Sequence, residues 1–205
     1  MAKNKGEQIS GAIGDVIYSS WKGRPYVKRR PESVANPKTE KQQSHRNGFG
    51  AISRLSSAMK EGHKIGLHAW AVREKLDTFS AFKKINKNCH SADGIDYARV
   101  CISRGSVERS YVTSAKVDNQ GVVHVTFHSN TTPENQYDQF FLFVCCPDQR
   151  EGRCAAPVVR TAGEVHASIP AEWMGHPLHL YAFMKAEKGN RTSDSDYVGQ
   201  FCTSE

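Results

Sequence analysis

Long apolar runs are missing from this chain of 205 residues. No stretch approaches the roughly 20 apolar residues that a membrane-spanning helix needs, so no membrane partner is expected. The first fifteen residues contain lysines but no apolar run, which is unlike a secretory signal peptide. We therefore expect the protein to be cytoplasmic as synthesised, with release or incorporation into a particle only through lysis or a specialised apparatus.

The compact motifs of common enzyme classes are also missing. The sequence has no Gly-x-Gly-x-x-Gly, no phosphate-binding loop and no Gly-x-Ser-x-Gly. His124 and His128 share one face of a predicted strand but lie roughly 13 Å apart along it, too far to bind one metal ion together. We therefore predict no enzyme activity, no cofactor and no metal site. An enzyme acting through loops near His176 and His179 stays open as a third class of function.

Paired CxxC motifs are absent from the six cysteines, so the usual ligand pairs of a closed zinc site are lacking. Cys145 and Cys146 are adjacent, and on a strand they would face opposite sides. In a reducing compartment all six are expected to be thiols, and a bridge to Cys154 would need an oxidising one. The cysteines are Cys89, Cys101, Cys145, Cys146, Cys154 and Cys202.

Charge, in contrast, is abundant and unevenly placed. Residues 1–100 carry 19 Lys and Arg against 9 Asp and Glu, a balance of +10, whereas residues 101–205 carry 9 against 12, a balance of −3. This asymmetry indicates an anionic partner for the first half, or contact between opposite halves of neighbouring subunits. A solvated lysine-rich surface is the alternative interpretation.

The first element predicted is a β-hairpin. Residues 16–21 and 24–29 alternate around the turn residues Lys22-Gly23, a pattern typical of a two-residue hairpin loop. This register pairs Trp21 with Arg24, Ser19 with Tyr26, and Ile17 with Lys28. Pro25 cannot donate a hydrogen bond to a neighbouring strand, so its strand should lie at an edge.

Helices are predicted after a connector at residues 31–37. The segment 36–40 (Asn-Pro-Lys-Thr-Glu) is a helix-start signal, and Phe49, Ile52, Leu55 and Met59 form one stripe that we expect to be buried. Gly48 and Gly50 indicate either close contact with another element or a break in that helix. A second helix is predicted from Asp77 or Thr78, with lysines at 83, 84 and 87 opposite its apolar side.

Strands dominate the rest of the chain. Turn residues separate eight candidate strands, at residues 98–103, 110–117, 121–128, 139–146, 155–161, 164–169, 178–186 and 196–202. Residues 140–144 are apolar on both faces and should lie centrally. The predicted fold class is α+β: a hairpin and helices over residues 1–96, then an antiparallel β-sandwich of the immunoglobulin or fibronectin-III type over residues 97–205.

Several short motifs carry a resemblance that spans nearly the whole chain. They are Ser20-Trp21-Lys22-Gly23 with Tyr26, Asn36-Pro37-x-Thr39 with Gln42 and Arg46, Ile95-Asp96-Tyr97, Ser103-Arg104-Gly105, and residues 193–197 (Ser-Asp-Ser-Asp-Tyr). With these motifs the chain resembles an uncharacterised family of gut and environmental Bacteroidota, a domain of unknown function. The segment from Asn36 to Arg46 also resembles part of small bacteriophage-associated proteins, which would imply a virion, a prophage-derived particle or another large assembly.

The predicted binding site is the hairpin with its connector, where aromatic and cationic side chains alternate. We expect a non-enzymatic assembly or binding protein that associates with itself or with another protein through this segment. The alternative is a nucleic-acid-binding protein, because aromatic rings interleaved with cations suit single strands. The candidate residues are Tyr18, Trp21, Lys22, Arg24, Tyr26, Lys28, Arg29 and Arg30.

Overall fold

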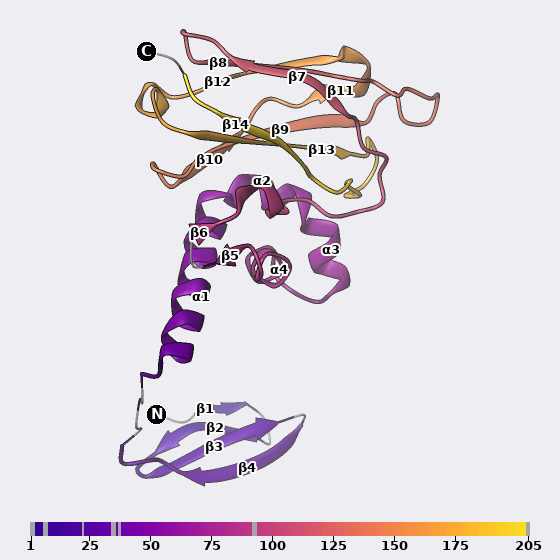
Figure 1. Ribbon diagram of the computed structural model, residues 1–205. Coiled ribbons are helices and arrows are strands. Elements are labelled where there is room, and N and C mark those ends of the chain that lie inside the picture. Colours follow the sequence, from indigo (N-terminus) through magenta and orange to yellow (C-terminus); the bar gives the residue numbers. More distant parts are fainter. Residues whose placement is uncertain are drawn as a thin grey trace. The chain divides into compact units, whose positions relative to one another are not determined.

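The computed structural model describes residues 3–5, 8–21, 23–33, 36, 38–91 and 94–203 (Figure 1). The chain divides into two compact units, residues 1–42 and 43–205. The boundary predicted between residues 96 and 97 falls inside the second unit. No helix in the described part of the chain is long and apolar enough to cross a membrane.

The first unit is a four-stranded antiparallel sheet in the order β1-β2-β3-β4. Its strands are β1 (Lys3–Lys5), β2 (Gln8–Ile13), β3 (Val16–Trp21) and β4 (Arg24–Arg29). The predicted hairpin register is confirmed, since Trp21 pairs with Arg24, Ser19 with Tyr26 and Ile17 with Lys28. Strand β4, which carries Pro25, lies at the edge as expected. Strands β1 and β2 were not predicted.

Helix α1 (Glu40–Ala58) spans the division between the units, and its Gln42 N–H donates to the Thr39 hydroxyl at 3.3 Å. Three shorter helices follow: α2 (Lys60–Gly66), α3 (His68–Arg73) and α4 (Thr78–Ile85). Asp77 caps α4 by accepting the Ser80 N–H at 2.9 Å, which confirms the predicted start. A short ladder, β5 (His90–Ser91) with β6 (Gly94–Ile95), and the 3₁₀ turn η1 (Tyr97–Arg99) complete the helical part.

Gly48 and Gly50 do not break helix α1, which runs without interruption from Glu40 to Ala58. A side chain at Gly48 would meet the His90 ring at 3.3 Å, so this glycine permits close contact with another element. The predicted buried stripe is correct for Ile52, Leu55 and Met59 but wrong for Phe49, which is 57% exposed.

Two antiparallel sheets form the remainder of the second unit (Figure 1). One has the order β12-β8-β7, and the other β10-β9-β13-β14 with β11 also paired to β9. The strands are β7 (Val112–Val117), β8 (Val122–Phe127), β9 (Gln139–Cys146), β10 (Glu151–Cys154), β11 (Val158–Val159), β12 (Glu164–Ser168), β13 (Leu178–Lys185) and β14 (Asp196–Phe201). The 3₁₀ turns η2 (Arg160–Ala162) and η3 (Ala171–Trp173) lie in the connections. With the helices, these antiparallel sheets confirm the α+β class.

Two of the eight predicted strands are wrong or misplaced. Residues 98–103 form no strand, because Asn86 holds this segment by hydrogen bonds to the N–H and carbonyl oxygen of Cys101. Residues 155–161 contain only the short β11 and then turn into η2, while the longer neighbouring strand is β10. These segments use side-chain and local hydrogen bonds that strand periodicity does not reveal.

Strand β9 lies between two hydrophobic cores, as its apolar character on both faces predicted. Phe141, Phe143 and Cys145 face a core shared with the helices, whereas Phe140, Leu142 and Val144 face a core shared with β8 and β12. Strand β13 alternates in the same way. The sheet that contains β9 and β13 is therefore the middle layer of the second unit, between the helices and the β12-β8-β7 sheet (Figure 1).

Candidate functional site

The N-terminal sheet has two chemically different faces, which follow from its register. Residues directly opposite each other on neighbouring strands share a face, and faces alternate along each strand. One set, the apolar face, carries Ile13, Val16, Tyr18, Pro25 and Val27, together with Gly11 and Ser20 and with Arg29 at its end. The other set, the aromatic–basic face, comprises Ile17, Trp21, Arg24, Tyr26 and Lys28.

The predicted site residues are thus divided between these two faces. Trp21, Arg24, Tyr26 and Lys28 lie together on the aromatic–basic face, whereas Tyr18 and Arg29 lie on the apolar face. Arg30 directly follows β4, and Lys22 lies outside the described residues. Arg24, Lys28, Arg29 and Arg30 are all exposed, and Arg29 forms an exposed ion pair with Glu32 at 3.5 Å.

Neither face of this sheet buries a core within the unit. Among the described residues from 10 to 42, none is buried. Val27 is 60% exposed and Trp21 67% exposed. Sheets are stable when an apolar face packs against something, yet both faces of this sheet leave large apolar side chains in solvent.

A basic pocket in the second unit was missed by the sequence analysis. Its walls come from α1, α4 and β5, and its volume is about 420 Å³. Lys83, Lys84 and Lys87 supply its positive charge, and Phe49 supplies an exposed ring. The lining residues are Ser44, His45, Gly48, Phe49, Ile52, Lys83, Lys84, Lys87 and His90. The lysine side of α4 is the part of this pocket that the sequence did indicate.

Lysine and aromatic side chains are in contact at this basic pocket. The Lys83 ammonium lies 4.9 Å from the centre of the Phe49 ring and 4.3 Å from that of Phe79, both within cation–π range. Lys84 points to α3 instead, where its Nζ is 2.9 Å from a carboxylate oxygen of Glu74. That contact holds the pKa of Glu74 below its usual range, through the hydrogen bond and the charge of Lys84.

A second pocket, of about 440 Å³, is lined by three arginines, Arg73, Arg104 and Arg191, and by Trp70. Two of the family-like motifs meet there, since the Gly105 N–H donates to Asp194 Oδ1 at 3.1 Å. Beneath it, the Ser103 hydroxyl donates to the carbonyl oxygens of Gly66 and Ser193. The Asp194 carboxylate lines the same pocket and Arg73 contacts Glu74 at 3.9 Å, so much of the positive charge is compensated.

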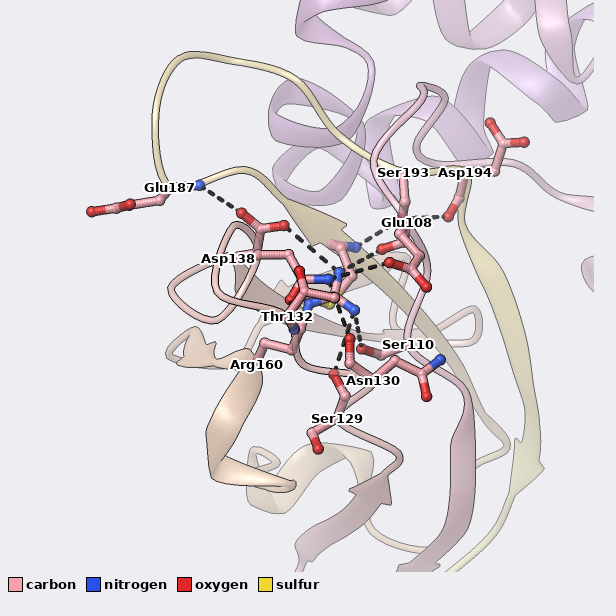
Figure 2. Close-up of polar contacts among 12 residues, drawn as sticks. Glu108, Ser110, Ser129, Asn130, Thr132, Asp138, Arg160, Glu187, Ser193 and Asp194 are labelled. Carbon is pink, nitrogen blue, oxygen red and sulfur yellow. Dashed lines mark hydrogen bonds and ion pairs between the residues drawn. The ribbon is translucent and has the colours of Figure 1, made fainter.

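A buried arginine organises the loops at one end of the two sheets (Figure 2). Arg160 has no exposed side-chain surface, and its guanidinium donates to the Glu108 carbonyl oxygen at 2.6 Å and to the Ser110 hydroxyl at 3.3 Å. Asp138 lies 3.7 Å away and in turn accepts the N–H of Glu187 at 3.1 Å. Because the guanidinium is enclosed by protein groups, this cluster is a structural joint rather than an open site.

The histidines on and between the strands of the second unit contact acidic or aromatic side chains. His124 Nε2 lies 2.9 Å from Asp118, a hydrogen bond that lowers the pKa of Asp118, and the His124 ring contacts His166 on β12. His176 pairs with Asp148 at 2.9 Å, whereas His179 stacks on Tyr97. Within the described ranges, no group of three or more His, Cys, Asp or Glu residues is arranged to hold a metal ion.

All six cysteines are unpaired thiols. Cys145 and Cys146 face the two different cores, which confirms that adjacent strand positions separate them. Burial raises the pKa of Cys145 and of Cys154 to about 12, so both are protonated at neutral pH. A protonated, buried thiol is a poor nucleophile and a poor metal ligand.

A family model matches most of the chain. The model of a family described as "Family of unknown function (DUF6266)" matches residues 8–199. No curated protein matches the chain.

Proposed function

Because the chain belongs to a family of unknown function, DUF6266, we propose a function from its geometry: a non-enzymatic binding and assembly protein that associates with further copies of itself through the N-terminal sheet. The observation that carries this proposal is the apolar face, which no other described residue of its own unit covers. Ile13 and Val27 on that face are both more than half exposed.

A second copy of the chain is the occupant we propose for the apolar face. Each copy brings an identical apolar face, so two copies supply mutually matched surfaces without any further partner. Apolar burial would stabilise such a contact. The charge difference between residues 1–100, at +10, and residues 101–205, at −3, would favour a separate contact between opposite halves of neighbouring copies.

The second unit is proposed to be an immunoglobulin- or fibronectin-III-like sandwich with helices added to one sheet. The support is the strand order, in which the first, second and sixth strands form one sheet and the third, fourth, fifth, seventh and eighth form the other. The two sheets share the core between β8, β9, β12 and β13. Such a unit is a stable scaffold that an assembly can display.

The setting we propose is a large assembly, such as a phage-derived particle. Its support is the resemblance of residues 36–46 to small bacteriophage-associated proteins. Within this segment, Pro37 lies outside the residues that the structure describes. The cytoplasm is the proposed place of synthesis, and the Bacteroidota origin stays a prediction from the same kind of resemblance.

Light scattering after size exclusion tests self-association. We expect the parent protein at micromolar concentration to run as a dimer or larger species. Val27→Glu places a charge on the apolar face and should give monomers, whereas Val72→Glu is the matched control on α3, since Val72 is similarly exposed at 65%. A parent protein that is monomeric at every salt and protein concentration contradicts the proposal, as does a Val27→Glu variant that assembles normally.

Nucleic acid binding by the aromatic–basic face is the second candidate function. The observation that favours it is the gathering of Trp21, Tyr26 and Lys28 on one exposed face, with Arg24 beside them. Binding of this kind weakens steeply with salt because counterions are released. A gel shift with a single-stranded oligonucleotide should be lost in Arg24→Glu/Lys28→Glu but kept in Lys60→Glu/Lys64→Glu; equal shifts for both variants would exclude this face.

A further inference from the structure

We propose that the basic pocket between α1 and α4 binds a nucleotide, with its phosphates on the lysines and its planar base on Phe49. This site is separate from the N-terminal sheet, and all of its lining residues lie in the second unit. The ligand chemistry is common to a free nucleotide and to a nucleotide within a single strand. The experiment below distinguishes these two sources.

The cations of the pocket are placed to hold phosphate. Lys83 lies in the last turn of α4 and Lys87 in the turn that follows the helix, and both line the pocket together with His90. None of the nine lining residues is acidic. Among the described residues, Lys83 and Lys87 have no carboxylate within ion-pair distance, whereas Lys84 is neutralised by Glu74 at 2.9 Å. Two uncompensated ammonium groups favour an anion.

Phe49 gives the pocket its second chemical character. An apolar ring at this position continues the buried stripe of α1, yet more than half of it is in solvent. The Lys83 ammonium lies over this ring, 4.9 Å from its centre, so a base that stacks on the ring would use the opposite face or displace the ammonium sideways, with this cation near its phosphate. Stacking on an aromatic side chain tolerates any base, because every base has a π-face.

Size and local backbone also fit a nucleotide. The volume of about 420 Å³ lies within the range of small-ligand sites. Gly48 allows the His90 ring to approach α1, where a side chain would meet the ring at 3.3 Å, so the wall of the pocket is set by this glycine. The arginine-lined pocket fits an anion less well because the Asp194 carboxylate stands among its cations.

The test measures ADP binding by calorimetry and binding of a fluorescein-labelled fifteen-nucleotide oligothymidylate by anisotropy, using the full chain at several salt concentrations. Lys83→Gln/Lys87→Gln removes the two phosphate cations, and Phe49→Ala removes the ring. The matched control is Lys60→Gln/Lys64→Gln, which makes the same charge change at two exposed lysines of α2. Circular dichroism melting confirms that each variant is folded.

We expect the double lysine variant to bind at least about tenfold more weakly and, with the oligonucleotide, to reduce the salt slope by about 1.4, the value for two lost phosphate contacts on a single strand. Phe49→Ala should weaken binding by at least about fivefold, the lower end for loss of one stacked base. The control should match the parent protein. Binding of ADP identifies a free nucleotide as the ligand, and binding of the oligonucleotide alone identifies a single strand.

Two results would overturn the proposal: no binding of either probe at concentrations up to about 1 mM in low salt, or unchanged affinity in the lysine and Phe49 variants. If the double variant does not fold, ¹⁵N chemical-shift perturbation in the parent protein replaces it, and shifts that avoid Phe49, Lys87 and His90 count against the site. Loss of oligonucleotide binding in Arg24→Glu/Lys28→Glu alone would assign that binding to the N-terminal sheet instead.

Discussion

At the scale of single residues, Arg160 shows how a buried charge can be structural. Its guanidinium joins the Glu108–Ser110 segment to the Asp138 loop, while its own Nε is buried without a partner among the described residues. Burying an ion is costly, and the cost is offset only while its partners remain in place. Removing one partner leaves the others buried and unpaired.

We therefore expect Arg160→Ala to lower the free energy of unfolding by about 3–5 kcal/mol. The control is Arg109→Ala, which breaks the partly exposed Arg109–Asp196 ion pair of 2.6 Å and should cost about 1 kcal/mol or less. Urea unfolding followed by circular dichroism measures both. Equal losses of unfolding free energy in the two variants would show that Arg160 does not hold these two segments together.

His63 makes the stability depend on pH in a predictable direction. Desolvation by burial lowers its pKa below the ordinary value of 6.5, and its Nε2 lies 2.9 Å from the Ser56 carbonyl oxygen, to which the neutral ring donates. The unfolded state therefore takes up a proton at a higher pH than the folded state does. Stability is then unaffected above pH 6.5 and falls as the pH decreases from 6.5 towards the lowered pKa.

The expected result is a lower urea midpoint at pH 5.5 than at pH 7.5, with a smaller difference in His63→Gln. His68→Gln, at an exposed position on α3, should keep the parental difference. His179, whose pKa is lowered by burial alone, contributes in the same direction, so some dependence should remain in the His63 variant. A parent protein equally stable at both pH values contradicts this account.

At the scale of elements, glycine allows the end of helix α1 to lie close to strand β10 and to the Phe143 ring of β9. A side chain at Gly152 would collide with the Phe143 ring and with the carbonyl oxygen of Ala58. Gly50, in contrast, lies in α1 with room for a methyl group, since the nearest atom is the end of the Arg54 side chain at 3.5 Å. The same substitution should therefore have opposite effects at the two sites.

Gly152→Ala is expected to destabilise the protein by about 1–3 kcal/mol through overpacking. Gly50→Ala is expected to stabilise it by about 0.5–1 kcal/mol, because alanine favours the helix. Thermal melting of the two single variants beside the parent protein checks the signs. A neutral or stabilising Gly152→Ala would mean that β10 has room to move away from α1.

The sequence predicted those elements whose signals are local. The β3–β4 register followed from the two-residue turn, the start of α4 from Asp77, and the central position of β9 from a run that is apolar on both faces. Strand β2 was missed because its residues, with Gly11 in the middle, show no clear alternation. Phe49 continues the helical stripe of α1, and nothing in the stripe reveals that its side chain is more than half exposed in the folded protein.

The two candidate sites also differ in whether the sequence alone could reveal them. The aromatic–basic face of the N-terminal sheet could be read from alternation within one hairpin. The basic pocket could not, because it requires α1, α4 and His90 to meet, and their sequence separation hides that arrangement. The charge compensation by Asp194 and Glu74 is likewise a property of the folded chain.

At the scale of the whole molecule, the two units differ in what they need to fold. The second unit contains both hydrophobic cores, whereas no described residue from 10 to 42 is buried. We therefore expect a chain starting at Thr39, which keeps helix α1 and its cap, to fold with its melting temperature changed by less than about 3 °C, equivalent to about 1 kcal/mol in a protein of this size. Calorimetry compares the two chains, and a truncated chain without a cooperative transition would contradict this.

The same truncation should abolish self-association, since it removes the apolar face. Light scattering on the truncated chain gives the readout, and a dimer that persists would place the contact in the second unit. The two measurements are independent because one reports folding and the other the interface.

The middle sheet has a consequence for how this protein could have been built. Because β9 and β13 contribute alternate side chains to both cores, neither the helices nor the β12-β8-β7 sheet can be exchanged for an unrelated segment without exposing half of a buried strand. Recombination at the loop after Ile95 would separate halves that depend on each other. We therefore expect residues 43–205 to be inherited as a single piece, whereas no described residue of the N-terminal sheet contributes to either core, so that sheet could be replaced without disturbing them.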